Sequence, residues 1–139
     1  MDVKYTADAV SSGGGRDGKV RSDDGILDLE VKMPPALGGP GGATNPEQLF
    51  AAAYATCFHG ALRLVAGNEK IKVPDGTTIE AQVGIGPDDT SFGLVATIIA
   101  SLPGLDQGQA DDLINKAHQV CPYSKATRGN IEVTLVTKV

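Results

Sequence analysis

The sequence contains few aromatic residues and few cysteines. Its 139 residues include three Tyr, three Phe and no Trp, and only two Cys. Two cysteines are too few for the disulfide framework of a small secreted domain, and a chain of this length can bury a usable core without such bridges. We therefore expect a single domain, residues 1–139, with a core of small aliphatic side chains.

Net positive charge is also missing, and a secretory signal is not expected. The formal charge is −5, so no net basic field attracts a polyanion, and nucleic acid is not an expected partner. The N-terminus, MDVKYTADAV, carries early charges and no apolar core, unlike a secretory signal. The apolar stretch 49–66 is nearly long enough to span a membrane, but it contains His59 and Arg63, which are costly in lipid. We expect a cytoplasmic protein that does not bind a membrane.

The stretch 44–66, TNPEQLFAAAYATCFHGALRLVA, predicts a long central helix. Asn45 is a good N-cap, and Pro46 suits the first helical position. The body is apolar and rich in Ala, and Gly67 with the following Asn ends it. The same helix carries Cys57, so we expect a buried helix that holds one thiol.

Alternating apolar residues predict strands on both sides of this helix. A second amphipathic helix lies within 102–120 and ends at Cys121-Pro122, because a residue before proline leaves helical geometry. The predicted strands are 3–11, 19–22, 26–32, 78–86, 92–101 and 131–139. The order is β-β-β-α-β-β-α-β, in which helices do not alternate regularly with strands. We therefore expect an α+β fold with a mostly antiparallel sheet wrapped around the central helix.

Cys57 and Cys121 can be buried spectators, metal ligands or a redox pair. The pairs Cys57-x-His59 and His118-x-x-Cys121 suggest zinc by composition. However, positions i and i+2 of a helix point about 200° apart, so Cys57 and His59 cannot face one ion, and the spacing matches no compact zinc motif. We expect no metal site. We interpret His118 as a polar residue on the exposed side of the second helix, rather than as a base beside Cys121.

A redox role for Cys57 requires an activated thiol. A free thiol has a reference pKa of about 8.5, and burial raises it further. Cys57 lies in mid-helix, too far from the positive N-terminal end to benefit from it. Arg63 lies six residues beyond Cys57, about 240° round the helix, so its side chain points away from that of Cys57. Arg16 and Arg128 each lie in a Gly-containing loop, where the backbone can turn inward. Arg16, in the turn GGGRDG, is the stronger candidate for the activating cation, and Glu47 can orient its guanidinium through a bidentate pair. The alternative for Arg16 is a solvated turn residue.

Four segments carry a family resemblance: GGGRDG (13–18), LGGPGG (37–42), TNPEQLFAAAYATCF (44–58) and VCPYSKATRGNIEV (120–133). They resemble the organic hydroperoxide resistance branch of the osmotically inducible protein family of thiol peroxidases. The resemblance implies an intertwined homodimer with two active sites at the interface and no bound cofactor. It also implies alkyl or fatty-acid hydroperoxides as substrates, and dihydrolipoamide or a lipoylated protein as the electron donor.

The resemblance also assigns roles to single residues. Cys57 is similar to the peroxidatic cysteine, which becomes a sulfenic acid, and Cys121 to the resolving cysteine, which closes a disulfide with it. Arg16 is similar to the arginine that polarises the peroxidatic thiol, and Glu47 to the carboxylate that holds this arginine. We expect apolar side chains to line a slot for the alkyl chain, with plain core packing as the alternative for each: Phe50, Phe58, Phe92, Leu94 and Tyr123.

Glu47 and Cys57 are ten residues apart, which corresponds to about 15 Å along a straight helix. One arginine does not easily bridge that separation. Either the helix starts after Glu47 and the chain folds back, or Glu47 of one subunit serves Cys57 of the other across a two-fold axis.

Two other functions stay open at this point. One is a peroxidase of the sister branch of the family, with a different peroxide preference. The other is a non-catalytic dimer that binds a ligand such as a fatty acid and uses its cysteines as a redox sensor. Turnover with a dithiol reductant distinguishes the peroxidases from the sensor, because a sensor is oxidised stoichiometrically without turnover.

Overall fold

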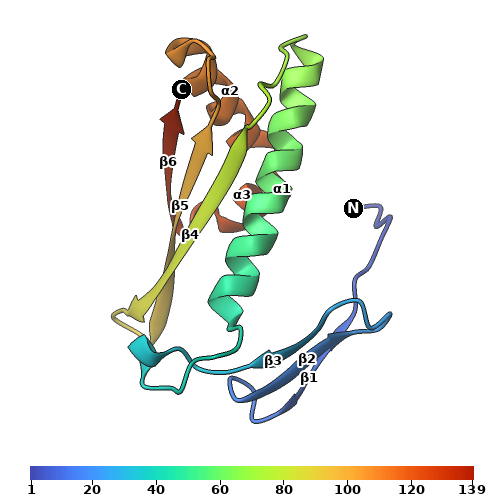
Figure 1. Cartoon of the computed structure of the whole chain (residues 1–139), viewed down its shortest axis with the longest axis vertical. Coiled ribbons are helices and arrows are strands. Elements are labelled where there is room, and N and C mark those ends of the chain that lie inside the picture. The colour runs from blue at the N-terminus through green and yellow to red at the C-terminus, as the bar shows by residue number, and fades with distance from the viewer. The chain divides into compact units, whose positions relative to one another are not determined.

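The structure is a computed structural model that describes all 139 residues. The chain divides into two compact units, residues 1–49 and residues 50–139, and its strands form two three-stranded sheets (Figure 1). The predicted α+β class is confirmed. The prediction of a single sheet is wrong, because the three strands before the long helix form one sheet and the three strands after it form another. That residues 1–139 form one domain stays a prediction.

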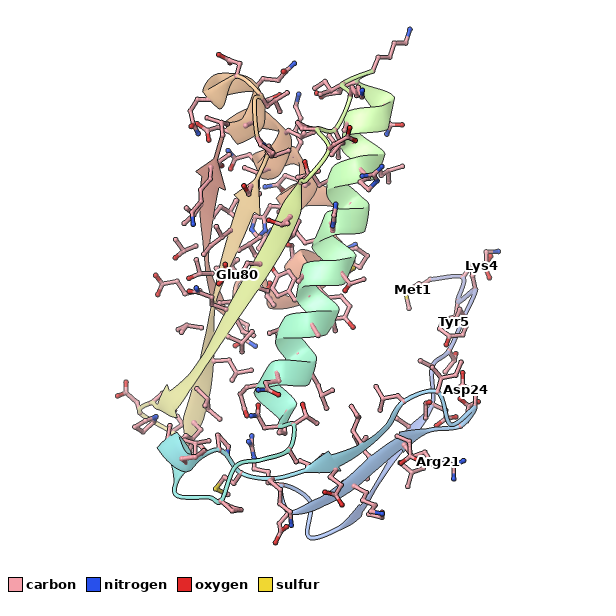
Figure 2. The ribbon with its side chains drawn as sticks, viewed as in Figure 1. Met1, Lys4, Tyr5, Arg21, Asp24 and Glu80 are labelled. Atoms are coloured by element: carbon pink, nitrogen blue, oxygen red, sulfur yellow. The ribbon has the colours of Figure 1, made fainter.

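The first unit contains an antiparallel meander of β1 (Ala9–Gly13), β2 (Gly18–Ser22) and β3 (Asp28–Val31). The strand predicted over 3–11 begins only at Ala9, and the segment before it, which carries the exposed Tyr5, has no regular secondary structure (Figure 2). Ala9 pairs with Ser22, the last residue of β2. The chain turns after Ser22, so residues before Ala9 have no strand to pair with.

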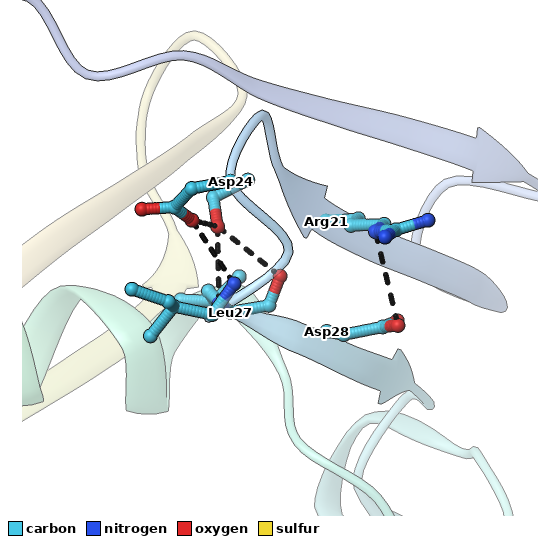
Figure 3. Close-up of polar contacts among 6 residues, drawn as sticks. Arg21, Asp24, Leu27 and Asp28 are labelled. Carbon is cyan, nitrogen blue, oxygen red and sulfur yellow. Dashed lines mark hydrogen bonds and ion pairs between the residues drawn. The ribbon is translucent and has the colours of Figure 1, made fainter.

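The turn between β2 and β3 is held by side chains (Figure 3). The Ser22 hydroxyl donates to Asp24 Oδ1 at 2.6 Å and accepts from the Leu27 amide at 3.0 Å. Arg21 and Asp28 face each other across the two strands, with 3.9 Å between Nε and Oδ2. Both of these side chains are exposed, so this pair contributes little to stability. The turn instead sets the register of β2 on β3.

The long helix α1 runs from Pro46 to Asn68, close to the predicted bounds. Its N-cap is confirmed, because Asn45 Oδ1 accepts a hydrogen bond from the Gln48 amide at 2.9 Å. The Pro- and Gly-rich loop before it contains one short 3-10 helix, η1 (Pro35–Leu37). Thr44, just before the cap, forms a parallel bridge with Val31 at the end of β3.

The second unit holds the other sheet. β4 (Thr78–Pro87) and β5 (Phe92–Ser101) are antiparallel, and β6 (Glu132–Lys138) lies parallel to β5. All three strands agree with the predicted ranges to within one residue at each end. Parallel neighbours require a crossover connection, which runs here through helix α2 (Gln107–Val120). The fold is therefore mostly antiparallel, as predicted, with one parallel pair.

The core of the second unit lies between α1, α2 and β5. On α1 the buried side chains recur at every fourth residue and form one face, as expected for a helix packed on one side. The fully buried members on this face are Tyr54, Phe58, Leu62 and Ala66. α1 is also the one helix that is long and apolar enough to cross a membrane, which is weak evidence because core helices have the same composition.

A third helix, α3 (Pro122–Thr127), was not predicted. Cys121 ends α2 in extended geometry, with φ −63° and ψ 123°, as the following proline requires. Pro122 then occupies the first position of a new helix, where its missing N–H costs nothing. The predicted order of elements is therefore incomplete, and Cys121 lies at the junction between two helices.

Candidate active site

The structure brings the two thiols together. Cys57, in the middle of α1, and Cys121, between α2 and α3, have their Sγ atoms 3.9 Å apart. Both are free thiols, Cys57 partly exposed and Cys121 fully buried. A disulfide bond requires about 2.05 Å between the sulfurs, so the two sulfurs must move closer together before a bond forms. A pair of this kind can cycle between dithiol and disulfide.

The surroundings of Cys57 in the second unit do not activate its thiol. Burial raises the pKa of Cys57 above its ordinary value, the backbone N–H of Tyr123 opposes this rise, and the neighbouring Cys121 adds to it. The net direction is upward, which keeps the thiol protonated at neutral pH. This agrees with the prediction that Cys57 requires a cation from elsewhere.

The predicted bidentate pair between Arg16 and Glu47 is present in the first unit. Arg16 Nη1 donates to Glu47 Oε2 at 3.0 Å, and Nη2 donates to Oε1 at 2.8 Å. The hydrogen bonds from Arg16 lower the pKa of the Glu47 carboxyl, and Glu47 raises the pKa of the guanidinium. The Glu47 side chain is only 12% exposed, whereas that of Arg16 is 39% exposed. The carboxylate therefore anchors a guanidinium that keeps part of its surface free.

The Gly-rich turn explains how Arg16 reaches this position. Gly15, next to Arg16, has φ +70°, a backbone conformation that favours glycine. A Cβ at Gly18 would lie 2.1 Å from the carbonyl oxygen of Ser12 across the β1–β2 pair. The motif GGGRDG is thus a tight turn that only glycine permits at these positions, and it holds one arginine at its tip.

His118 does not lie where the sequence placed it. His118 is half-buried, and its Nδ1 lies 2.8 Å from Ser124 Oγ, so the prediction of an exposed residue is wrong. The missed signal is the spacing of four from Ile114, which places His118 on the buried face of α2. His59 Nε2 is buried without a hydrogen-bond partner. No three metal-binding side chains form a cluster in the structure.

The five side chains predicted for a substrate slot lie in different places. Phe50 and Tyr123 pack around Tyr54, with ring centroids 6.1 Å and 6.0 Å from it. Phe58 is fully buried in the core, so it cannot line an open slot in this conformation. The remaining two side chains, Phe92 and Leu94, line a separate cavity of about 650 Å³ between the β4–β5 hairpin and the start of β6.

Comparisons with known proteins agree with this architecture. Residues 39–136 match the family model of OsmC-like protein. An organic hydroperoxide resistance protein of Xanthomonas axonopodis pv. citri is 52% identical over 134 residues, which cover 96% of this chain and 94% of that protein. The organic hydroperoxide resistance protein OhrB of Bacillus subtilis is 47% identical, covering 93% of this chain and 95% of that protein.

A solved structure is similar over nearly the whole chain. The crystal structure of an organic hydroperoxide resistance protein from Elizabethkingia anophelis superposes with a TM-score of 0.92 at 51% sequence identity, covering 99% of both chains. Identity of about one half over almost the full length establishes the relationship independently of the thiol geometry. The chain belongs to the OsmC-like family, and its relatives of about 50% identity include organic hydroperoxide resistance proteins.

Proposed function

We propose that this protein is a thiol-dependent peroxidase that reduces organic hydroperoxides, of the alkyl or fatty-acid type, to alcohols. Membership of the family supports a role in peroxide detoxification. The observation that carries the finer proposal is the 3.9 Å separation of Cys57 Sγ and Cys121 Sγ. Two free thiols in contact, one partly exposed and one buried, suit a reactive thiol and a second thiol that traps its oxidised form.

The reaction begins with the Cys57 thiolate, which attacks the outer oxygen of ROOH. The O–O bond breaks, Cys57 becomes a sulfenic acid, and RO⁻ takes a proton and leaves as the alcohol. Cys121 then attacks the sulfenic sulfur, and water leaves as the Cys57–Cys121 disulfide forms. The partly exposed Cys57 thus meets the peroxide, and the buried Cys121 meets only Cys57.

Arg16 supplies the activation in this proposal. The local environment raises the pKa of Cys57, so a fixed positive charge is needed to favour the thiolate and then the departing alkoxide. The bidentate hold of Glu47 on Arg16 supports this role, because it orients the guanidinium in advance. Cys57 and Cys121 together with Arg16 and Glu47 are the proposed catalytic set.

We further propose that each site combines two subunits of a homodimer. Helix α1 begins at Pro46, before Glu47, and continues past Cys57, so the alternative in which the helix starts after Glu47 is wrong. Two residues ten positions apart on one helix are separated by about 15 Å along its axis. We therefore propose that Arg16 and Glu47 of one subunit serve the thiol of the other.

Recycling of the enzyme completes the proposed cycle. A dihydrolipoyl dithiol, free or on a lipoylated protein, attacks the Cys57–Cys121 disulfide, forms a mixed disulfide and leaves as the cyclic disulfide, which returns both thiols. No bound cofactor takes part. We propose the cytoplasm as the location, because a reducing compartment keeps the resting cysteines as thiols.

Peroxide turnover with dihydrolipoamide tests the proposal. The wild type is compared with Cys57→Ser and Cys121→Ser, on tert-butyl hydroperoxide and on hydrogen peroxide. We expect Cys57→Ser to lose all thiol oxidation, and Cys121→Ser to be oxidised once at Cys57 without efficient turnover. Equal oxidation of the two variants contradicts the assignment of Cys57. Stoichiometric oxidation of the wild type without turnover supports a sensor, and a preference for hydrogen peroxide supports the sister branch.

A further inference from the structure

A buried polar network joins α1, α2 and α3 next to the thiols. The Tyr54 hydroxyl contacts Ser124 Oγ at 2.9 Å and Thr127 Oγ1 at 3.2 Å. Thr127 Oγ1 donates to the Ser124 carbonyl at 3.1 Å, and His118 Nδ1 contacts Ser124 Oγ at 2.8 Å. Tyr54, Ser124 and Thr127 are all at least 98% buried. Ser124 is the centre of the network, because its atoms take part in three of these four contacts.

The direction of each hydrogen bond follows from the number of available hydrogens. The three hydroxyls supply one hydrogen each, whereas there are four contacts. Thr127 gives its hydrogen to a carbonyl, so Tyr54 donates to Thr127 and Ser124 donates to Tyr54. The fourth hydrogen must come from His118 Nδ1, which donates to Ser124. The network is fully satisfied only when His118 carries a hydrogen on Nδ1, as the pairing of buried polar groups requires.

The network and the thiol contact are neighbouring parts of one interface. Tyr54 and Cys57 lie three residues apart on α1, and Cys121 and Ser124 lie three residues apart at the start of α3. Tyr54 contacts Ser124, whereas Cys57 contacts Cys121, so α3 runs antiparallel to α1 at this point. The hydrogen bond between Tyr54 and Ser124 therefore fixes the position at which Cys121 meets Cys57.

A second tie holds the same segment from α2. Arg128, just after α3, donates from Nη2 to the carbonyl oxygen of His118 at 2.7 Å, and its amide donates to the Ser124 carbonyl at 2.9 Å. Contact between two reduced thiols is a weak interaction, because sulfhydryl groups are weak donors and acceptors. The polar network is thus a stronger restraint on α3 than the thiol contact.

We propose that Tyr54, Ser124, Thr127 and His118 are positioning residues that hold Cys121 ready to condense with the oxidised Cys57. This inference rests on the proposed peroxidase function and deepens it. The Cys57 sulfenic acid has two competing fates. Attack by Cys121 forms the disulfide and releases water, whereas a second ROOH adds an oxygen to give the sulfinic acid and releases ROH. A well-placed Cys121 favours the first fate, because the reaction is intramolecular.

Single-turnover oxidation of purified dimer by tert-butyl hydroperoxide tests the proposal. Ser124→Ala removes the centre of the network, and Tyr54→Phe removes one hydroxyl while it keeps the aromatic ring. Thr127→Val removes a third hydroxyl from the network. Its matched control is Thr77→Val, because the Thr77 hydroxyl lies outside the network and donates to the Pro74 carbonyl. Circular dichroism establishes that each variant is folded at the assay temperature. If Ser124→Ala does not fold, Tyr54→Phe and Thr127→Val decide the question.

Two quantities are measured in each variant. We expect the rate of sulfenic acid formation at Cys57 to stay within about twofold of wild type. We expect the ratio of sulfinic acid to disulfide, measured by mass spectrometry, to rise about tenfold in the network variants and to stay unchanged in Thr77→Val. A tenfold change is the size expected for the loss of one buried hydrogen bond.

The outcomes separate this inference from the function on which it rests. An unchanged ratio in the folded network variants overturns the positioning role and leaves the peroxidase function intact. An equal loss in both steps also overturns it, because it indicates general loosening of the fold. Failure of wild-type Cys57 to react with the hydroperoxide overturns the peroxidase function itself, and the positioning role with it.

Discussion

Arg16 and Glu47, separated by 31 residues in the sequence, form a two-pronged ion pair with N–O distances of 3.0 and 2.8 Å. The fork geometry of the guanidinium is what makes two parallel hydrogen bonds to one carboxylate achievable. Lysine keeps the charge but loses this geometry.

Replacement of Arg16 tests its proposed role. We expect Arg16→Lys to lower kcat/KM for tert-butyl hydroperoxide by about 10- to 100-fold, and Arg16→Ala by more, since one lost electrostatic donor costs a factor of about 10²–10³. In both variants, the pH at which iodoacetamide alkylation of Cys57 becomes fast should also be higher than in the wild type, because the thiolate is the species that reacts. Arg21→Lys is the control, because this exposed arginine pairs with Asp28 at 3.9 Å. Equal effects at Arg16 and Arg21 contradict the proposal.

Mixed dimers test whether the site is shared between subunits. Glu47→Ala and Cys57→Ser chains are each expected to form poorly active or inactive homodimers. If each site takes Glu47 from one chain and Cys57 from the other, a dimer with one chain of each kind has one intact site and one site that lacks both residues. We therefore expect about half of wild-type activity. Activity of no more than about half that of the Glu47→Ala homodimer places both residues of a site on the same chain, because such a dimer then holds one Glu47→Ala site and one Cys57→Ser site.

The stability of the protein should depend on the protonation of His118. Burial lowers the pKa of His118, and the positive charge of Arg128 lowers it further. As the pH falls, His118 therefore takes up a proton at a higher pH in the unfolded chain than in the folded protein. The free energy of unfolding decreases as the pH falls from about 6.5 to the folded-state pKa of His118. Stability is not affected by this group at higher pH, where His118 is neutral in both states.

Urea unfolding at pH 7.5 and pH 5.5 measures this effect. We expect the wild type to lose stability on acidification by at most about 1.4 kcal/mol per pH unit from this one proton. His118→Gln keeps an N–H donor for Ser124 and cannot titrate, so it should lose less. The same loss in both proteins would show that other groups cause the acid sensitivity.

The turn that carries Arg16 should not tolerate a side chain at Gly18. The Cβ of Gly18→Ala would meet the Ser12 carbonyl oxygen at 2.1 Å, which requires the backbone to move and costs about 1–3 kcal/mol. We expect kcat/KM to fall with the displaced Arg16. Gly67→Ala is the control, since a Cβ there meets no atom within 4 Å and alanine favours a helix by up to about 1 kcal/mol. Wild-type activity in Gly18→Ala would show that the turn adapts.

Local signals in the sequence determined several elements correctly. The start of α1 follows from Asn45 and Pro46, whose capping roles depend only on their immediate neighbours. The end of α2 at Cys121 likewise follows from Pro122. The bounds of β4, β5 and β6 follow from alternation of apolar residues. The need for a cation near Cys57, which follows from general properties of a buried thiol, stays a prediction.

Other features depend on partners that the sequence does not reveal. β1 starts at Ala9 because β2 ends opposite it at Ser22, and no local pattern shows where a partner strand ends. β5 and β6 pair in parallel because the chain between them crosses over, a choice that alternation within a strand does not record. Pro122 ends α2 and also begins α3. Because proline is compatible with both roles, the sequence does not show that a new helix follows.

By itself, the sequence determined the class of fold, the central helix and its thiol, and through resemblance the family and its candidate residues. Only the tertiary structure decided which groups meet: Cys57 with Cys121 across 64 residues, and Tyr54 with Ser124 across 70. It also placed the half-buried His118 in contact with Ser124, rather than on the expected surface, and placed Phe58 in the core. The physical reason is that local preferences act within a few residues, whereas these contacts form only when packing brings distant segments together.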